Sequence, residues 1–190
     1  MTQLTGNSPL IEPQNVATEQ VIIVDRCNRS LGAVTRPIMR NQGLIHRASY
    51  VLVCNRQGKL FIQKRTAVKD VFPGYWDIAA GGVVMARESY EESARRELRE
   101  ELGIKVKGIH HLFDHFYDGP DTKVWGRVFT CTHNGPFTLQ QEEIEYGCFL
   151  ALDAVAALNE KEPVTPDGME ILQRLQLEAP AAWLRVSRKE

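Results

Sequence analysis

Residues 82–104 read GVVMARESYEESARRELREELGI, and this segment sets the architecture that we predict for the whole chain. Its spacing of apolar residues predicts a helix over residues 88–102, and a glycine ends it directly afterwards. A helix turns by about 100° per residue, so Ala94 and Leu102 lie about 40° to either side of Leu98. These three side chains are expected to form the buried stripe of the helix.

Three glutamates occupy one edge of this helix. On the same angular scale, Glu101, Glu97 and Glu100 lie at about −60°, −100° and −160°, next to the buried stripe. Such like charges destabilise a helix by about 0.2–0.5 kcal/mol per pair. A hard divalent cation would offset the repulsion, because Mg²⁺ and Mn²⁺ prefer oxygen ligands. The sequence therefore predicts a metal site here, with a solvated acidic face balanced by nearby arginines as the alternative.

The composition is that of one ordinary globular domain. The chain has 190 residues, of which 43% are hydrophobic and 25% charged, and this fits one domain with modest extensions. Its net charge of −1 gives no electrostatic case for a nucleic-acid partner. No segment approaches the roughly 20 apolar residues of a bilayer span, and residues 1–19 do not resemble a signal peptide. The four cysteines form no CxxC pair. We therefore expect a cytoplasmic protein with reduced thiols and no membrane partner.

The rest of the chain alternates between strand-like and helix-like segments. We expect a flexible extension at residues 1–19, a single domain at residues 20–178 and a C-terminal tail at residues 179–190. Gly81 and Gly82 are expected to open a loop. Strands are predicted at residues 21–25, 33–35, 50–54, 59–64, 76–80, 106–117, 124–132 and 146–150. Further helices are predicted at residues 37–42, 152–159 and 168–177. This mixture predicts an α/β (α+β) fold with a mixed sheet between helices.

The segment with the three glutamates also matches a known motif. It reads Gly82, five residues, Glu88, seven residues, Arg96-Glu97-Leu98, one residue, Glu100-Glu101, one residue, Gly103-Ile104. This spacing resembles the Nudix box at every specified position, without a gap. Nudix hydrolases cleave nucleoside diphosphates linked to another moiety. The resemblance implies that residues 20–178 form one Nudix hydrolase domain, an α/β/α sandwich whose box spans residues 82–104.

The resemblance also implies roles for the charged residues of the box. Glu97, Glu100 and Glu101 would ligate Mg²⁺ or Mn²⁺, and one of them could also act as the general base. Glu88 and Arg96 would form a supporting ion pair. The reaction would be the attack of metal-activated water on a diphosphate bond, so the expected partner is a small-molecule diphosphate.

Substrate contacts are predicted at three positions. Gly82 would let the backbone approach metal or substrate closely, although a plain turn also explains a glycine there. Arg65 follows a predicted strand and is a candidate for bidentate phosphate binding, as is Arg47, with surface cations as the alternative. Further candidates are His46, Arg127, Phe72, Tyr75 and Trp76.

A glutamate outside the box is a further catalytic candidate. Glu143, with its neighbour Glu142, precedes the predicted strand that contains Phe149. Some Nudix enzymes use a glutamate from outside the box, so the resemblance makes Glu143 a candidate base. Taken alone, both residues are typical of a surface turn.

Three upstream segments resemble the isopentenyl-diphosphate isomerase branch of the same superfamily. They are residues 24–32, 43–48 and 72–76. The isomerases carry Cys-Gly-His where this chain has Gly81-Gly82-Val83, and their second acid falls near Lys123. Because an isomerase needs those acids to protonate an alkene, we predict a hydrolase on an isomerase-like frame.

Two other functions stay open as alternatives. One is the isomerase itself, and the other is a non-catalytic sensor that binds a nucleotide or a diphosphate. The sequence carries no signature that selects one substrate among the diphosphates. It also leaves the oligomeric state open, with a homodimer as one option.

Overall fold

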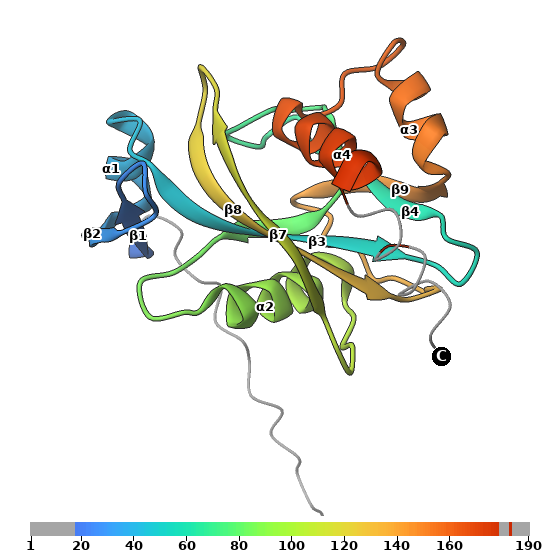
Figure 1. The fold of residues 1–190 in the computed structure, drawn as a ribbon, viewed down its shortest axis with the longest axis horizontal. Helices are drawn as coiled ribbons and strands as arrows, with labels where there is room; N and C mark the ends of the chain where they lie inside the picture. The colour runs from blue at the N-terminus through green and yellow to red at the C-terminus, as the bar shows by residue number, and fades with distance from the viewer. Residues whose placement is uncertain (1–17, 179–182, 184–190) are drawn as a thin grey trace, which may run out of the picture.

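The computed structural model describes residues 18–178 and Trp183. Most of the expected extension at residues 1–19 and of the tail at residues 179–190 lies outside the described residues. The elements, in chain order, are β1 (Gln20–Val24), β2 (Ser30–Thr35), α1 (Arg36–Asn41), β3 (His46–Cys54), β4 (Leu60–Arg65), β5 (Trp76–Asp77), β6 (Ala80–Val83), α2 (Tyr90–Leu102), β7 (His110–Asp118), β8 (Lys123–Thr132), β9 (Ile144–Leu150), α3 (Leu152–Leu158) and α4 (Pro166–Glu178) (Figure 1).

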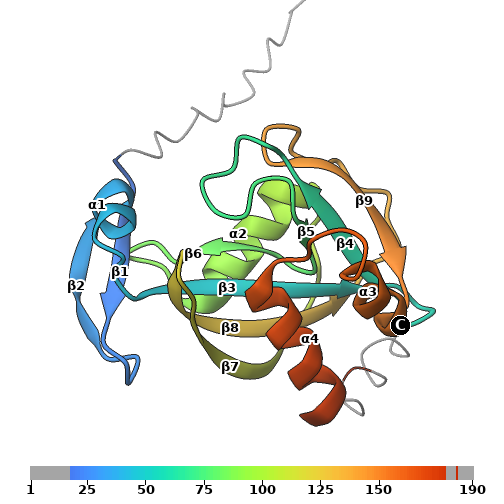
Figure 2. The ribbon, with the colours of Figure 1, turned by 90° about the horizontal axis from the view of Figure 1, so that it is seen from above.

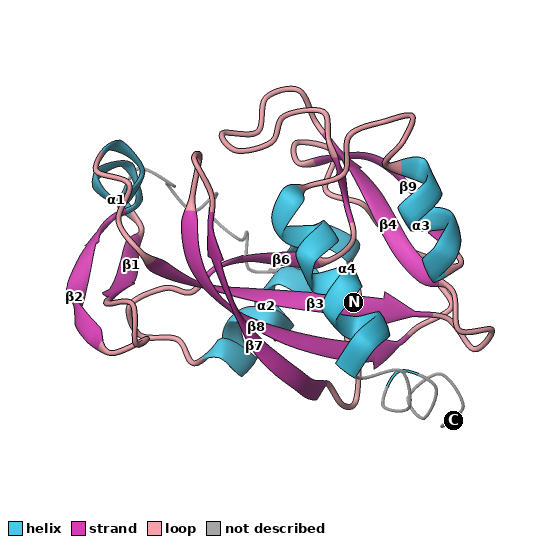
Figure 3. Ribbon diagram, turned by 45° about the horizontal axis from the view of Figure 1, so that its top comes forward, coloured by secondary structure: helices cyan, strands magenta, loops and turns pink. Residues whose placement is uncertain are grey.

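A mixed sheet lies between two helical layers. Strand β3 runs through its centre, pairs in parallel with β8 along its whole length, and pairs antiparallel with β1, β4 and β6. Strand β4 continues the sheet to β5 and β9. Helix α2 covers one face, while α3 and α4 cover the other (Figures 1 and 3). This arrangement confirms the predicted α/β/α sandwich.

The core divides according to the alternation of side chains along β3. Val51 and Val53 pack toward Leu98 of α2, whereas Leu52 packs toward Ile171 of α4. Successive side chains of a strand point to opposite faces, so a strand covered on both faces is apolar at nearly every position. Residues Val51 to Cys54 are accordingly all buried.

Helix α2 begins two residues later than predicted. Ser89 is its N-cap, because the Ser89 side chain accepts a hydrogen bond from the Glu92 amide and the Glu92 carboxylate accepts one from the Ser89 amide. Glu88 therefore lies in the preceding loop. The helix ends as predicted at Gly103, whose φ of 67° is a left-handed conformation that glycine adopts freely.

The predicted strand at residues 76–80 is instead two strands in different places. Strand β5 pairs with β4, and β6 pairs with β3. The loop expected at Gly81 and Gly82 is part of β6. A Cβ on Gly81 would collide with the backbone oxygen of Ser49, so the glycine permits a close approach of strands.

The unit of β1, β2 and α1 lies at one end of β3 (Figure 2). Val21 and Met39 from this unit pack against Val83 of β6 in a small separate core. This packing places α1 beside the end of the sheet where the functional residues gather. No helix in the described part of the chain is long and apolar enough to cross a membrane.

Candidate active site

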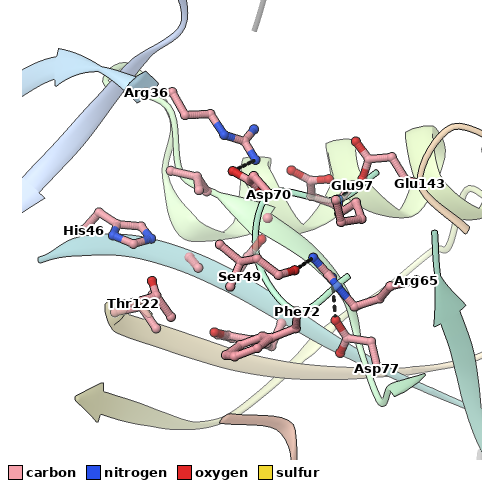
Figure 4. A pocket seen from close by; sticks show the side chains of 18 of the residues that line it. Arg36, His46, Ser49, Arg65, Asp70, Phe72, Asp77, Glu97, Thr122 and Glu143 are labelled. Carbon is pink, nitrogen blue, oxygen red and sulfur yellow. Dashed lines mark hydrogen bonds and ion pairs between the residues drawn. The ribbon is translucent and has the colours of Figure 1, made fainter. Parts of the chain in front are cut away.

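A cavity of about 500 Å³ opens at one end of the sheet. Its walls come from α1, β3, β6, the loop at residues 66–75 and the turn that precedes β9. Side chains from segments far apart in the sequence point into it, among them Arg36, Arg65, Glu97 and Glu143 (Figure 4). We refer to this space below as the cavity.

The glutamates of α2 meet the cavity at different depths, as their angular positions predict. Glu101 is 2% exposed and Glu97 is 8% exposed, whereas Glu100 is exposed. Glu97 and Glu100 line the cavity, and Glu101 lies beside them. The Glu101 Oε2 accepts hydrogen bonds from the Gly81 amide and from Gln63 Nε2, both at 3.2 Å.

Burial leaves these carboxylates short of compensating charge. Desolvation raises the pKa of Glu97 to about 7, although the Arg96 guanidinium opposes this shift. Desolvation raises the pKa of Glu101 well above its ordinary value, and the Glu97 and Glu143 carboxylates add to the effect. A buried carboxylate without a cationic partner destabilises the folded chain when it is ionised.

Arg96 is the cation closest to this group. It forms the predicted ion pair with Glu88, at 2.7 Å between Nε and Oε1. Its Nη1 also contacts the carboxylates of Glu97 and Glu100, at 2.7 Å and 3.0 Å. The box arginine therefore both anchors the loop before α2 and lies between two of the predicted metal ligands.

The donor set suits a hard divalent cation. The side chains are oxygen-only and partly desolvated, and they include buried carboxylates that require positive charge. In the described residues, no three acidic, histidine or cysteine side chains already form a metal cage. A cation would therefore have to compete with Arg96 for Glu97 and Glu100. The lack of a side chain at Gly82 makes room for the Glu97 carboxylate, with which a Cβ there would collide.

Glu143 and Arg65 also lie where the sequence predicts functional contacts. Both line the cavity, together with Glu142. The Glu143 carboxylate contacts Lys69 Nζ at 2.5 Å. Arg65 donates to the Asp77 carboxylate and to the Val71 carbonyl, each at 2.9 Å.

Arg47 is not brought into the cavity, and the structure does not support the substrate contact predicted for it. Its guanidinium donates to the side chain and the backbone of Asn28, both at 2.8 Å, and lies over the Tyr90 ring. Arg127 is likewise paired with Asp114 over the same ring. On β3, the neighbours His46 and Ala48 of Arg47 line the cavity instead.

Of the three aromatic candidates, only Phe72 lines the cavity. Trp76 is buried in the core and donates to the Glu162 carboxylate at 2.9 Å. Tyr75 packs against the Phe72 ring, with 5.6 Å between ring centroids.

Several residues of the cavity were missed by the sequence reasoning. Arg36 and Arg40 lie on one face of α1 and hold Asp70 between them, with Arg40 Nε at 3.1 Å from its carboxylate. Their spacing of four residues on a short helix was the available signal. Tyr50, Asp77 and Asp167 also line the cavity, but they are too far apart in the sequence to form a recognisable pattern.

His46 is a buried histidine in the wall of the cavity. Its Nδ1 contacts the Leu44 carbonyl at 3.1 Å. Burial lowers the pKa of His46 from 6.5 to about 4, and the nearby guanidinium of Arg40 acts in the same direction. Between these two pH values the unfolded chain binds a proton that the folded chain does not, so the folded state loses stability as the pH falls.

We expect His46→Gln to weaken this acid sensitivity. At pH 5, the difference between the two pKa values corresponds to about 2 kcal/mol of lost stability in the native chain. Urea unfolding of both proteins at pH 7.5 and pH 5 should therefore show a smaller loss in the variant, by about that amount. His110→Gln, at an exposed position, should leave the pH dependence unchanged. An equal loss of unfolding free energy between pH 7.5 and pH 5 in the native chain and in His46→Gln would contradict the expectation.

The fold and the carboxylate-lined cavity define the class of protein. A solved structure with the same fold is DR0079 from Deinococcus radiodurans, which is 26% identical with a TM-score of 0.71. That match covers 82% of this chain and 98% of the other. The same fold occurs in a MutT NUDIX hydrolase from Burkholderia pseudomallei, with a TM-score of 0.56 and 22% identity over 69% of this chain and 98% of the other, so the architecture is that of the Nudix hydrolases.

The sequence comparisons agree with the fold. Residues 44–175 match the NUDIX domain, so the chain belongs to the Nudix hydrolase family. An uncharacterised Nudix hydrolase of Pseudomonas aeruginosa, PA4841, is 40% identical over 161 residues, which cover 85% of this chain and 95% of the relative. The Nudix hydrolase YfcD of Escherichia coli K12 is 38% identical over 173 residues, 91% of each chain. Membership of this family implies hydrolysis of nucleoside diphosphate derivatives.

Proposed function

We propose that this enzyme hydrolyses a diphosphate bond in a nucleoside diphosphate derivative and depends on Mg²⁺ or Mn²⁺. The observation that carries the proposal is the convergence of Glu97, Glu100 and Glu143 on one cavity, with buried Glu101 directly beside them. Among the described residues, Glu101 has no ion-pair partner and Glu97 shares Arg96 with Glu88 and Glu100, so a divalent cation would supply the charge that this group lacks.

In this proposal, Glu97, Glu100 and Glu101 hold the metal. A bound cation would neutralise charge on the phosphoryl oxygens and lower the pKa of a water molecule. The Glu143 carboxylate, which lies near Glu97 in the cavity (Figure 4), accepts the proton of the attacking water as a general base. Arg65 binds a phosphate oxygen, since its Nε has no partner in the described part of the chain. Gly82 lets the Glu97 carboxylate lie against the backbone of β6, where it can reach the metal or the substrate.

A phosphate-release screen tests the proposal. Purified protein would be incubated with a panel of nucleoside diphosphate derivatives, with Mg²⁺, with Mn²⁺ or with EDTA. We expect turnover of at least one substrate class with metal and none with EDTA. Turnover that persists fully in EDTA would refute the metal dependence, and tight binding without turnover would indicate a sensor.

Two features of β6 favour the hydrolase over the isomerase as the function of this chain. Isomerases carry a cysteine acid where this chain has Gly81, and a Cβ at that position would collide with the Ser49 carbonyl. Val83, in place of their histidine, is buried in an apolar cluster with Met39. We propose that residues 20–178 form a single domain with an isomerase-like frame. The reaction that we propose for it is hydrolysis.

Gly82→Ala is expected to lower kcat/KM by roughly 10-fold to 100-fold. The added methyl group would displace the Glu97 carboxylate, and a misplacement of about 1 Å in an active site can cost 100-fold. Steady-state kinetics over a range of Mg²⁺ concentrations would measure the effect. Gly108→Ala is the matched control, because its nearest neighbour lies at 4.0 Å and outside the cavity. Equal rates in the two variants would show that the space at Gly82 is not needed.

A further inference from the structure

The loop at residues 66–75, which we call the cavity loop, contacts groups that the proposed hydrolysis assigns to the substrate. Lys69 Nζ contacts the Glu143 carboxylate at 2.5 Å, and the Val71 carbonyl accepts a hydrogen bond of 2.9 Å from Arg65. In the proposed function, Glu143 takes a proton from the attacking water and Arg65 binds a phosphate oxygen. The cavity loop therefore engages two groups that a bound substrate would need.

Asp70 lies between these two loop residues in the sequence and occupies a pair of arginines. Its Oδ2 lies 3.1 Å from Arg40 Nε and 3.8 Å from Arg36 Nη2, at the wall that α1 contributes (Figure 4). Although desolvation opposes the shift, the two guanidiniums hold the pKa of Asp70 below its usual range. Asp70 is therefore an anion at neutral pH, and it lies where two guanidiniums converge.

The same pair of arginines suits a phosphate group. Both line the cavity, and neither has a role in the proposed hydrolysis. A guanidinium binds phosphate and carboxylate oxygens with the same donors, so an anionic ligand in the cavity competes with Asp70 for them. Arg40 also donates to Thr122 Oγ1 at 3.3 Å, and Arg36 donates to the Glu19 carboxylate at 3.4 Å. These contacts would keep both guanidiniums in place without Asp70.

The cavity loop is held by polar contacts more than by apolar packing. None of its residues is buried, and Val68 is 83% exposed. Phe72, at the edge of an apolar cluster, has a φ of 51°, a left-handed conformation that is unfavourable for a residue other than glycine. A segment with few buried apolar contacts opens at a low free energy. A ligand that replaces the contacts of Lys69, Asp70 and Val71 could therefore displace the loop.

We propose that the cavity loop is an autoinhibitory segment, in which Asp70 occupies Arg36 and Arg40 in place of a phosphate group until a diphosphate displaces it. Displacement of the loop also separates Lys69 from Glu143 and frees this carboxylate. The inference rests on the proposed function, because it takes Glu143 as the base and a diphosphate as the ligand. The base would then be available only when an anionic ligand has entered the cavity. A lid that closes over its ligand would behave in the opposite way.

Binding of methylenebisphosphonate, which cannot be hydrolysed, measures the competition. Asp70→Asn removes the internal anion and keeps the shape of the side chain. We expect this variant of the full chain to bind methylenebisphosphonate with Mg²⁺ about fivefold more tightly than the native chain in titration calorimetry. Asp118→Asn is the matched control, because Asp118 pairs with Arg26 and Lys123 outside the cavity, and it should leave the affinity unchanged. Equal or weaker binding by Asp70→Asn, or no binding by either protein, would overturn the inference.

A double-mutant cycle tests whether the competition takes place at the arginines. In an Arg40→Gln background, Asp70→Asn should increase the affinity less than about twofold, since one of the guanidiniums for which the two anions compete is gone. The same fivefold gain in that background would show that Asp70 acts by its charge alone, without occupying the arginines, and the inference would fail.

Hydrogen–deuterium exchange of the native chain tests the displacement without any substitution. The amides of residues 66–75 should exchange about threefold faster with methylenebisphosphonate and Mg²⁺ than with Mg²⁺ alone. The turn at residues 55–58, outside the cavity, should not change. Slower exchange would show a closing lid and unchanged exchange a fixed wall, and either result would contradict autoinhibition. A diphosphate panel without turnover would refute the proposed hydrolysis, whereas the binding and exchange results decide separately whether a ligand displaces Asp70.

Discussion

Glu101→Gln is expected to lower kcat/KM at saturating Mg²⁺ by about 10³-fold and at the same time to raise the Tm of the metal-free protein. The activity falls because metal-ion stabilisation of transition-state charge is worth several kcal/mol, and about 1.4 kcal/mol corresponds to a factor of ten in rate. The stability rises because glutamine keeps the shape of the side chain and removes a charge that is buried among other carboxylates. The hydrogen bonds from Gly81 and Gln63 can still be accepted by the amide oxygen.

Thermal unfolding with and without Mg²⁺ would measure the opposing effects. The native chain should gain stability from Mg²⁺, since a ligand that binds only the folded state stabilises it, and the variant should gain less. Glu91→Gln is the matched control, because Glu91 is an exposed residue of the same helix that pairs with Arg95. It should keep the native rate. A Glu101→Gln variant that loses activity but also loses Tm without metal would indicate a structural role for this carboxylate.

The sequence predicts the part of the site that lies on one helix. Angular positions alone separate buried Glu101 and Glu97 from exposed Glu100, because helix geometry converts spacing directly into direction. Local rules also place Gly103 at the end of the helix. The predicted start of the helix is two residues too early. Ser89 and Glu92 form a capping box that begins the helix at Tyr90, so the motif residue Glu88 lies in the preceding loop.

The rest of the cavity depends on contacts between distant segments. Gly81 looked like a turn residue, yet the close approach of β3 places it in a strand. Arg47 and Arg65 are both basic residues in or beside strands, and only the contacts with Asn28, far away in the sequence, show that Arg47 is held outside the cavity. The Tyr50–Asp167 hydrogen bond joins residues 117 positions apart, so no local pattern could indicate it.

Glu143→Gln is expected to lower kcat by about 10²-fold to 10⁴-fold, which is the usual contribution of a general base. Metal binding should persist, because Glu97, Glu100 and Glu101 are unchanged. The position of Glu143 is well defined in the structure: its backbone carbonyl accepts from the Thr66 amide at 3.0 Å, and its carboxylate contacts Lys69. The lost step is therefore proton acceptance from water and not assembly of the site.

The dependence on pH and on metal distinguishes this role from that of a metal ligand. The rate of Glu143→Gln should recover part of its loss as the pH rises, since hydroxide needs no base to remove its proton. The Mg²⁺ concentration for half-maximal activity should stay within about twofold of the native value, because a base contributes to the transition state and not to metal affinity. Glu145→Gln, an exposed position on β9 outside the cavity, controls for the loss of a nearby charge. A large increase in the Mg²⁺ requirement of Glu143→Gln, without recovery at high pH, would instead make Glu143 a ligand of the metal, and the base would have to be sought among the glutamates of α2.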